Sequence, residues 1–131
     1  MIVHTLFPST VCFFELGRDL TKKEMSFIMK QKQKPNEGNK TSVNSNLLES
    51  KTLKNLNRFI EDSFEQYAKN ILRIKDNVSL NITQSWANYT QKGEFHHKHN
   101  HSNSFLSGVF YVRVEEDMDQ IMFFKEGYSQ I

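Results

Sequence analysis

The chain has 131 residues, of which 37% are hydrophobic, 12% aromatic and 24% charged, the proportions of a folded domain rather than of a disordered chain. A net charge of +2 is too small for a nucleic-acid-binding protein, which normally carries a concentrated basic stripe. The single cysteine, Cys12, excludes an internal disulfide and any Cys-x-x-Cys motif, and the longest apolar run, Val11–Phe14, is far too short to span a membrane. We therefore expect a cytoplasmic protein without a membrane segment.

The N-terminal third predicts short strands and then a helix. Residues 2–16 are apolar and aromatic with Pro8 among them, which favours one or two strands with a break. Thr21 and Glu24 then form a capping box, the usual start signal of a helix. We expect this helix over residues 22–31, with a buried side made by Met25, Ile28 and Met29.

The middle of the chain predicts a loop and a longer helix. Residues 32–49 are rich in Asn, Ser and Lys, as is typical of a solvated loop. Apolar residues then recur at steps of three and four, which predicts an amphipathic helix over residues 51–74. Its apolar stripe is Leu53, Leu56, Ile60, Phe64, Tyr67 and Ile71.

The last third changes to a period of two. Residues 80–89 alternate with polar side chains on both sides, a pattern that favours a strand with one face lining a cavity. Further strands are expected over residues 105–114 and 120–124. Helices followed by strands indicate an α+β fold with an antiparallel sheet.

Four of the five histidines lie within six positions: His96, His97, His99 and His101. On an extended backbone, the imidazoles of His99 and His101 point to the same face with Cα atoms roughly 6 to 7 Å apart, close enough to share one metal ion. His97 and His99 form a second pair with the same spacing, so spacing does not choose between them. An exposed histidine-rich loop without a metal is the other interpretation of this pattern.

Residues 82–112 closely resemble a family of 2-oxoglutarate- and Fe(II)-dependent oxygenases of marine cyanophages and bacteria, within the prolyl-hydroxylase-like superfamily. The family pattern is a Trp-bearing strand, a Gly, a His-x-His pair and Ser-Gly-Val-x-Tyr. It is matched here by Trp86, Gly93, His99, His101, Ser107, Gly108, Val109 and Tyr111.

The resemblance implies a double-stranded β-helix, a jelly-roll or cupin-like barrel that holds iron and 2-oxoglutarate and uses O2 to hydroxylate a substrate. His99 matches the first iron ligand, and His101 stands where the superfamily usually has a carboxylate. Tyr89, ten residues before His99, matches a tyrosine that contacts the cosubstrate in related enzymes.

The chain departs from the family pattern after residue 112. No histidine follows His101, and the later basic residues are Arg113 and Lys125, so neither a distal iron ligand nor a cosubstrate-binding basic residue is evident. We expect one incomplete, C-terminally truncated oxygenase domain that is inactive by itself. Residues 1–76 would form its strand and helical N-terminal part and residues 77–131 its first barrel strands. If the gene belongs to a phage, the compartment would be the host cytoplasm.

Two other functions stay open at the level of sequence. One is a non-catalytic, cupin-like module that holds a metal ion with His97, His99 and His101. The other is a phage structural or interaction protein in which the histidine loop has no metal. The substrate to be hydroxylated is not indicated by any residue pattern.

Overall fold

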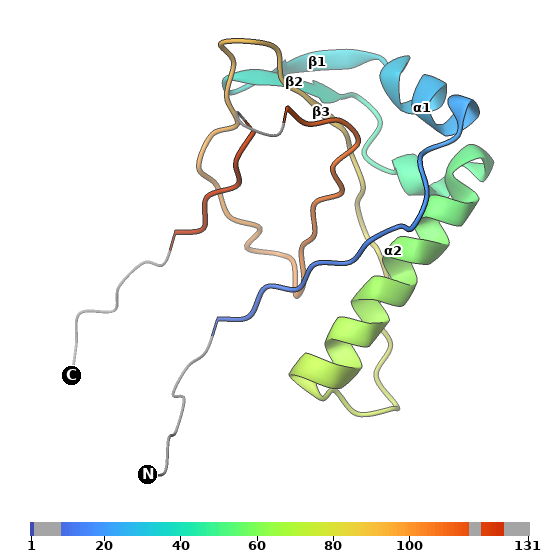
Figure 1. The fold of residues 1–131 in the computed structure, drawn as a ribbon, viewed down its shortest axis with the longest axis vertical. Helices are drawn as coiled ribbons and strands as arrows, with labels where there is room; N and C mark the ends of the chain where they lie inside the picture. The colour runs from blue at the N-terminus through green and yellow to red at the C-terminus, as the bar shows by residue number, and fades with distance from the viewer. Residues whose placement is uncertain (2–8, 116–118, 125–131) are drawn as a thin grey trace.

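The computed structural model describes residues 1, 9–115 and 119–124. It contains two helices and a three-stranded antiparallel sheet, which confirms the expected α+β class (Figure 1). The sheet lies at one end of the molecule beside α1, and a long irregular C-terminal segment returns across the space between the sheet and α2. No helix of the described part of the chain is long and apolar enough to cross a membrane.

Helix α1 spans Lys22–Met29 and begins with the predicted capping box: the Thr21 hydroxyl accepts from the Glu24 backbone, and the Glu24 carboxylate accepts from Thr21. Ile28 is buried and Met25 is half-buried. Met29 is exposed, so the prediction that it faces the core is wrong. The helix ends two residues early because the Gln31 side chain bonds back to the Phe27 carbonyl.

Helix α2 spans Lys54–Tyr67 and is extended at both ends, so the predicted helix over 51–74 is confirmed. A 3-10 turn, η2 at Lys51–Leu53, precedes it, and a π-helical turn, η3 at Ala68–Leu72, follows it. The helical path ends at Arg73, whose φ of 51° is left-handed. Leu53 and Leu56 are buried, as the stripe at steps of three and four requires, but Ile71 at its far end is 42% exposed, so that part of the prediction is wrong.

Residues 32–49 were expected to form a loop and instead carry a β-hairpin, so that prediction is wrong. Strand β1, Gln33–Asn36, pairs with β2, Asn39–Ser42, through a turn at Glu37–Gly38, and a short 3-10 helix, η1 at Leu47–Glu49, follows. Gly38 has a φ of +79°, a value that favours glycine at a tight turn. Pro35 lacks a backbone N–H and is tolerated because β1 is an edge strand.

The predicted strand over residues 80–89 is formed only in part. Strand β3, Asn88–Tyr89, pairs with β2, and Ser85 makes an isolated bridge to Asn46. Ser85, Ala87 and Tyr89 are half-buried while their neighbours are exposed, so the period of two is kept. The alternation therefore predicts which side chains turn inward, but it overestimates the length of the ladder.

The strands predicted over residues 105–114 and 120–124 are absent from the described residues, and residues 9–16 also form no strand. The other residues of the first predicted strands, 2–8, lie outside the described part of the chain. Within that part, no backbone hydrogen bond joins residues 105–114 to a neighbouring segment, and a strand needs such a partner. The segment still alternates, because Phe110 and Val112 pack on the core while Tyr111 and Arg113 are exposed.

The core is small and is shared by the two helices and the turns that join them. Its buried members are Ile28, Leu47, Leu53 and Leu56. The C-terminal segment covers one side of α2, where Phe110 meets Phe59 edge to face with ring centroids 6.4 Å apart. This contact attaches the C-terminal segment to α2.

Candidate metal centre

The histidine-bearing segment is held against the turn of the β1–β2 hairpin. It has no regular secondary structure between β3 and residue 101. The Phe95 backbone N–H donates to the Gly38 carbonyl at 3.0 Å, and Gly93, with a φ of +86°, allows the chain to turn back just before this contact. The four histidines that follow form what we call the histidine loop, residues 96–101.

The imidazole rings of the histidine loop gather around His99, and His101 contacts only His99 among them and is not in the compact group of three. Ring centroids lie 4.8 Å apart for His96 and His99, 4.9 Å for His97 and His99, and 4.8 Å for His99 and His101. One ligand atom from each of His96, His97 and His99 lies within 4.8 Å of the others. Among the described residues, this group consists of imidazoles and contains no carboxylate.

His99 is oriented as a metal ligand should be. Its Nδ1 lies 2.9 Å from the His97 backbone carbonyl, and a carbonyl oxygen can only accept, so Nδ1 carries the proton. The lone pair is therefore on Nε2, the atom that faces Nε2 of His101. Metal-binding histidines commonly use this type of outer contact.

The predicted pair, His99 and His101, is brought together. The two Nε2 atoms are 3.2 Å apart. Two nitrogens bound to one ion at roughly 2.0 to 2.1 Å lie about 3.3 Å apart in a tetrahedral site and about 2.9 Å apart as neighbours in an octahedral one. The observed spacing fits a shared ion. The His101 ring also lies against Trp86, with centroids 5.6 Å apart, so Trp86 supports the site although its side chain is 39% exposed.

His96 lies where the loop meets the sheet. Its Nδ1 is 3.3 Å from the amide nitrogen of Asn39, a buried residue of β2. The pKa of His96 is lowered from its ordinary value, first because burial disfavours the charged ring and then because His99, His97 and His101 repel it. The neutral imidazole is thus favoured in the middle of the cluster.

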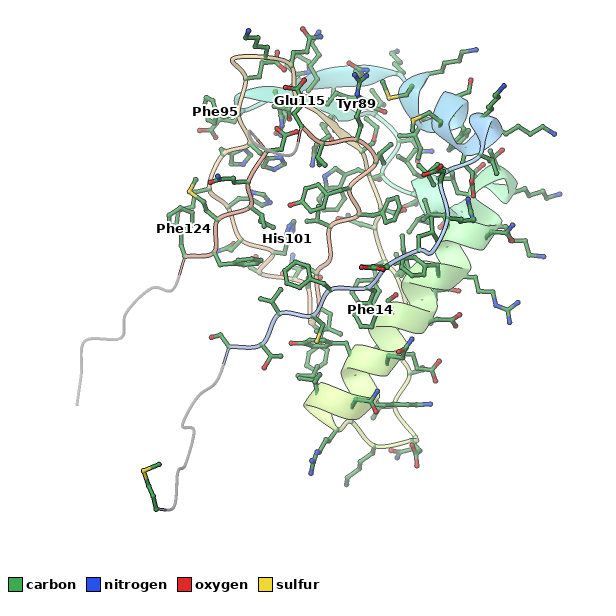
Figure 2. All side chains as sticks on the ribbon, in the orientation of Figure 1. Phe14, Tyr89, Phe95, His101, Glu115 and Phe124 are labelled. Carbon is green, nitrogen blue, oxygen red and sulfur yellow. The ribbon has the colours of Figure 1, made fainter. Side chains whose placement is uncertain are left out.

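Tyr89, the predicted cosubstrate contact, is engaged elsewhere. Its hydroxyl donates to the Ile28 carbonyl of α1 at 2.6 Å, and burial raises the pKa of the phenol. The next residue, Thr90, instead meets Asn39. Figure 2 shows Tyr89 beside the sheet and His101 farther from it, among the C-terminal loops. The structure thus ties Tyr89 to the core, and the role proposed for it stays a prediction.

Several residues around the cluster carry no sequence signal for that place. Glu37 and Asn39 lie in a polar stretch that predicts a solvated loop, and they reach the histidines only because the hairpin forms. Thr90 acts one step away, by accepting from Asn39. Gly38 signals a turn, yet nothing in the sequence says what the turn will touch.

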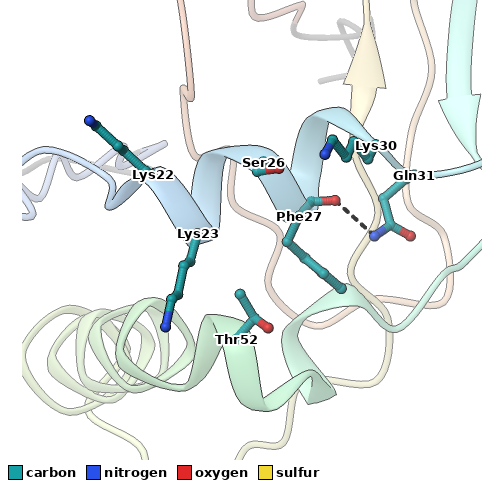
Figure 3. Close-up of a pocket in the computed structure, with 7 residues that line it drawn as sticks. All are labelled: Lys22, Lys23, Ser26, Phe27, Lys30, Gln31 and Thr52. Carbon is teal, nitrogen blue, oxygen red and sulfur yellow. Dashed lines mark hydrogen bonds between the residues drawn. The ribbon is translucent and has the colours of Figure 1, made fainter.

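Two surface hollows lie away from the histidines. The larger, about 650 Å³, is on α1 next to η2 (Figure 3) and is lined by Lys22, Lys23, Ser26, Phe27, Lys30, Gln31 and Thr52. Its lining holds no histidine or carboxylate. The smaller, about 90 Å³, has Ile82, Thr83, Gln84 and Ser85 on one wall and η1 and α2 on the other. Its wall takes four consecutive residues rather than one strand face, so it does not confirm the cavity that the alternation of residues 80–89 favoured.

Comparison with known proteins identifies one family. Residues 84–130 match a family described as "Putative 2OG-Fe(II) oxygenase". The match begins just before Trp86 and includes the whole histidine loop. No match was found among curated proteins or among solved structures.

Proposed function

We propose that this chain carries the metal site of a 2-oxoglutarate- and Fe(II)-dependent oxygenase, with His99 and His101 as iron ligands. The observation that carries the proposal is the 3.2 Å separation of their Nε2 atoms inside the segment that matches the oxygenase family. The spacing suits one ion, and the two histidines lie inside the segment that matches a family of iron enzymes.

The histidines of the loop offer imidazole nitrogens, which are suitable ligands for iron. When bound, Fe(II) supplies open coordination positions for 2-oxoglutarate and O2, which react to hydroxylate a substrate. The chain's own part is to orient the imidazoles toward one another. The His97 carbonyl holds the proton of His99 on Nδ1, and Trp86 supports the ring of His101.

Tyr89 is proposed as the cosubstrate contact on the resemblance alone. Reaching a ligand would require its hydroxyl to leave the Ile28 carbonyl, to which it now donates. A barrel completed by segments beyond the small observed sheet belongs to the same proposal, as does an origin in a phage or bacterium.

A second function is favoured by the absence of a carboxylate from the cluster. A carboxylate offsets part of the charge of Fe(II), which a neutral imidazole cannot do, and imidazole-only sites suit Zn²⁺ or Ni²⁺ as well. The alternative is therefore a metal-binding module without turnover.

The two functions are separated by adding Fe(II) and then 2-oxoglutarate to the anaerobic protein. An oxygenase site gives a visible charge-transfer band, because the 2-oxo acid chelates the iron, and glutarate, which lacks the 2-oxo group, gives none. We expect the band in the native chain and its loss in the double variant His99→Ala, His101→Ala. Iron binding without any band would support the module and contradict the oxygenase.

A further inference from the structure

We propose that His97 is the third protein ligand of the metal centre and that the β1–β2 turn, Glu37–Asn39, is the element that positions it. This inference rests on the proposed metal site and deepens it, because it finds the missing ligand inside the histidine loop rather than in a distal segment. It also gives a function to the hairpin, which the sequence indicated only as a solvated loop.

The first support is the outer contact of His97. Its Nδ1 lies 3.3 Å from the backbone carbonyl of Glu37, at the tip of the hairpin. A carbonyl only accepts, so this contact places the proton on Nδ1 and leaves the Nε2 lone pair for a metal, the same arrangement that His99 has. The ring is half-buried and stands 4.9 Å, centroid to centroid, from that of His99.

The second support is that the turn contacts three successive residues, Phe95 and the first two of the histidine loop. Glu37 meets His97, the Gly38 carbonyl accepts from the Phe95 backbone at 3.0 Å, and Asn39 meets His96. Asn39 is itself held, because it accepts from Asn36 and donates to Thr90. The start of the histidine loop is therefore fixed to the sheet through backbone and side-chain contacts.

Gly38 leaves no room for a side chain at this junction. A Cβ built there would lie 2.6 Å from the Phe95 carbonyl oxygen and 2.8 Å from its ring. Contacts that short require the turn and the histidine loop to separate. Gly38 is thus the residue through which the hairpin can be tested without changing any histidine.

His96 competes with His97 for the role of third ligand, since both belong to the compact group. The Asn39 amide nitrogen, a donor, faces Nδ1 of His96. This arrangement makes Nδ1 the acceptor and places the proton on Nε2, so the neutral ring offers the cluster no lone pair from that atom. His96 then serves to attach the loop to β2, and His97 is the ligand.

The ligand assignment is tested by titrating the protein with Co²⁺, whose visible spectrum reports its ligands, while circular dichroism checks that each variant is folded. His97→Ala should weaken Co²⁺ binding by more than about 100-fold, and His96→Ala by less than about tenfold. Unchanged binding in His97→Ala, or a larger loss in His96→Ala, would overturn the assignment.

The hairpin is tested with a matched pair of glycine variants. Gly38→Ala should weaken Co²⁺ binding by about 10 to 100-fold, the usual effect of losing an outer contact of a metal ligand. Gly17 also has a positive φ, +72°, but a Cβ there meets nothing within 4 Å, so Gly17→Ala carries the same backbone strain without the clash. Equal Co²⁺ affinity in the two variants would contradict a positioning role for the turn.

The same proteins separate this inference from the oxygenase proposal. If Co²⁺ binding depends on His97 but 2-oxoglutarate leaves the iron spectrum unchanged, the oxygenase proposal fails and the ligand assignment stands. If His97→Ala keeps both metal affinity and the 2-oxoglutarate band, the assignment fails and the oxygenase stands. A native chain that binds no Co²⁺ contradicts both.

Discussion

Glu24 shows at the scale of one residue how a local sequence signal acquires a second role in the fold. The capping box predicts that its carboxylate bonds back to Thr21, which it does. The structure adds Arg18, whose guanidinium makes two hydrogen bonds of 2.8 Å to the same carboxylate. Glu24 is only 3% exposed, and its hydrogen bonds to Arg18 are the main reason that its pKa falls to about 2.

This depressed pKa makes part of the stability depend on acidity. The folded-state pKa of Glu24 is below the ordinary 4.5, so its contribution is present above about pH 4.5 and is lost as the pH falls toward 2. Glu24→Gln keeps a capping side chain but removes the charge that pairs with Arg18. We expect it to cost about 1 to 3 kcal/mol at pH 7, since the lost bonds are charge-assisted, and progressively less below pH 4.5.

Urea unfolding followed by circular dichroism at pH 7, 4 and 2.5 measures this difference. Glu65→Gln is the control, because Glu65 pairs with Lys69 on the surface and both side chains are more than half exposed. Its substitution should change stability little at any pH. A Glu24→Gln cost that is the same at pH 7 and pH 2.5 would show that the ion pair does not contribute.

The histidines illustrate what one residue's neighbours in sequence can and cannot predict. The period of two in an extended chain brings His99 and His101 to the same face, and this local rule needs no knowledge of the fold. The contact that orients His97 comes from Glu37, sixty residues earlier. No local pattern contains that information, so the sequence alone left His97 and His101 as alternatives.

At the scale of elements, α2 was predictable because its signal is long and regular. Its apolar residues define one face over several turns, and that face is where Leu53 and Leu56 are buried. The hairpin was missed because its side chains are polar on both faces: β2 buries Asn39 and Ser42 rather than apolar residues. Side-chain and backbone hydrogen bonds, such as that from the Ser42 backbone to the Ala87 carbonyl at 2.8 Å, hold it instead.

Leu53 tests how far the fold depends on the start of α2. It is 1% exposed, and it lies where η2 passes into α2. Leu53→Ala should cost about 2 to 5 kcal/mol, because it removes apolar contacts and leaves a cavity in a small core. Leu80→Ala is the control for the same chemical change, since Leu80 is 37% exposed and should cost far less. Urea unfolding measures the free energy of unfolding of both variants. Equal losses would mean that Leu53 is not part of the core.

At the scale of the whole molecule, packing is uneven. Four apolar residues form the buried cluster around the helices, whereas the C-terminal segment leaves large apolar side chains in contact with solvent. These include Phe105, Val109, Tyr111, Met122, Phe123 and Phe124. Large contiguous patches of exposed apolar side chains are typical of interaction sites. Local alternation predicted barrel strands in this segment. A strand forms only where a second strand pairs with it, and alternation carries no information about that partner.

The histidine loop lies at the junction of the two differently packed regions. Its start is attached to the hairpin through Phe95, His96 and His97, and its end meets Trp86 through His101. The hairpin and Trp86 therefore position the histidine loop, and the less regular segment follows it in sequence.

The central claim is that imidazoles of this loop hold iron, and X-ray absorption of the Fe(II)-loaded protein tests it most directly. The scattering of an imidazole ring beyond its first nitrogen distinguishes histidine from water or carboxylate ligands. We predict the signal of three imidazoles in the native chain and of two in His97→Ala. A first shell of oxygen atoms without imidazole scattering would contradict the account.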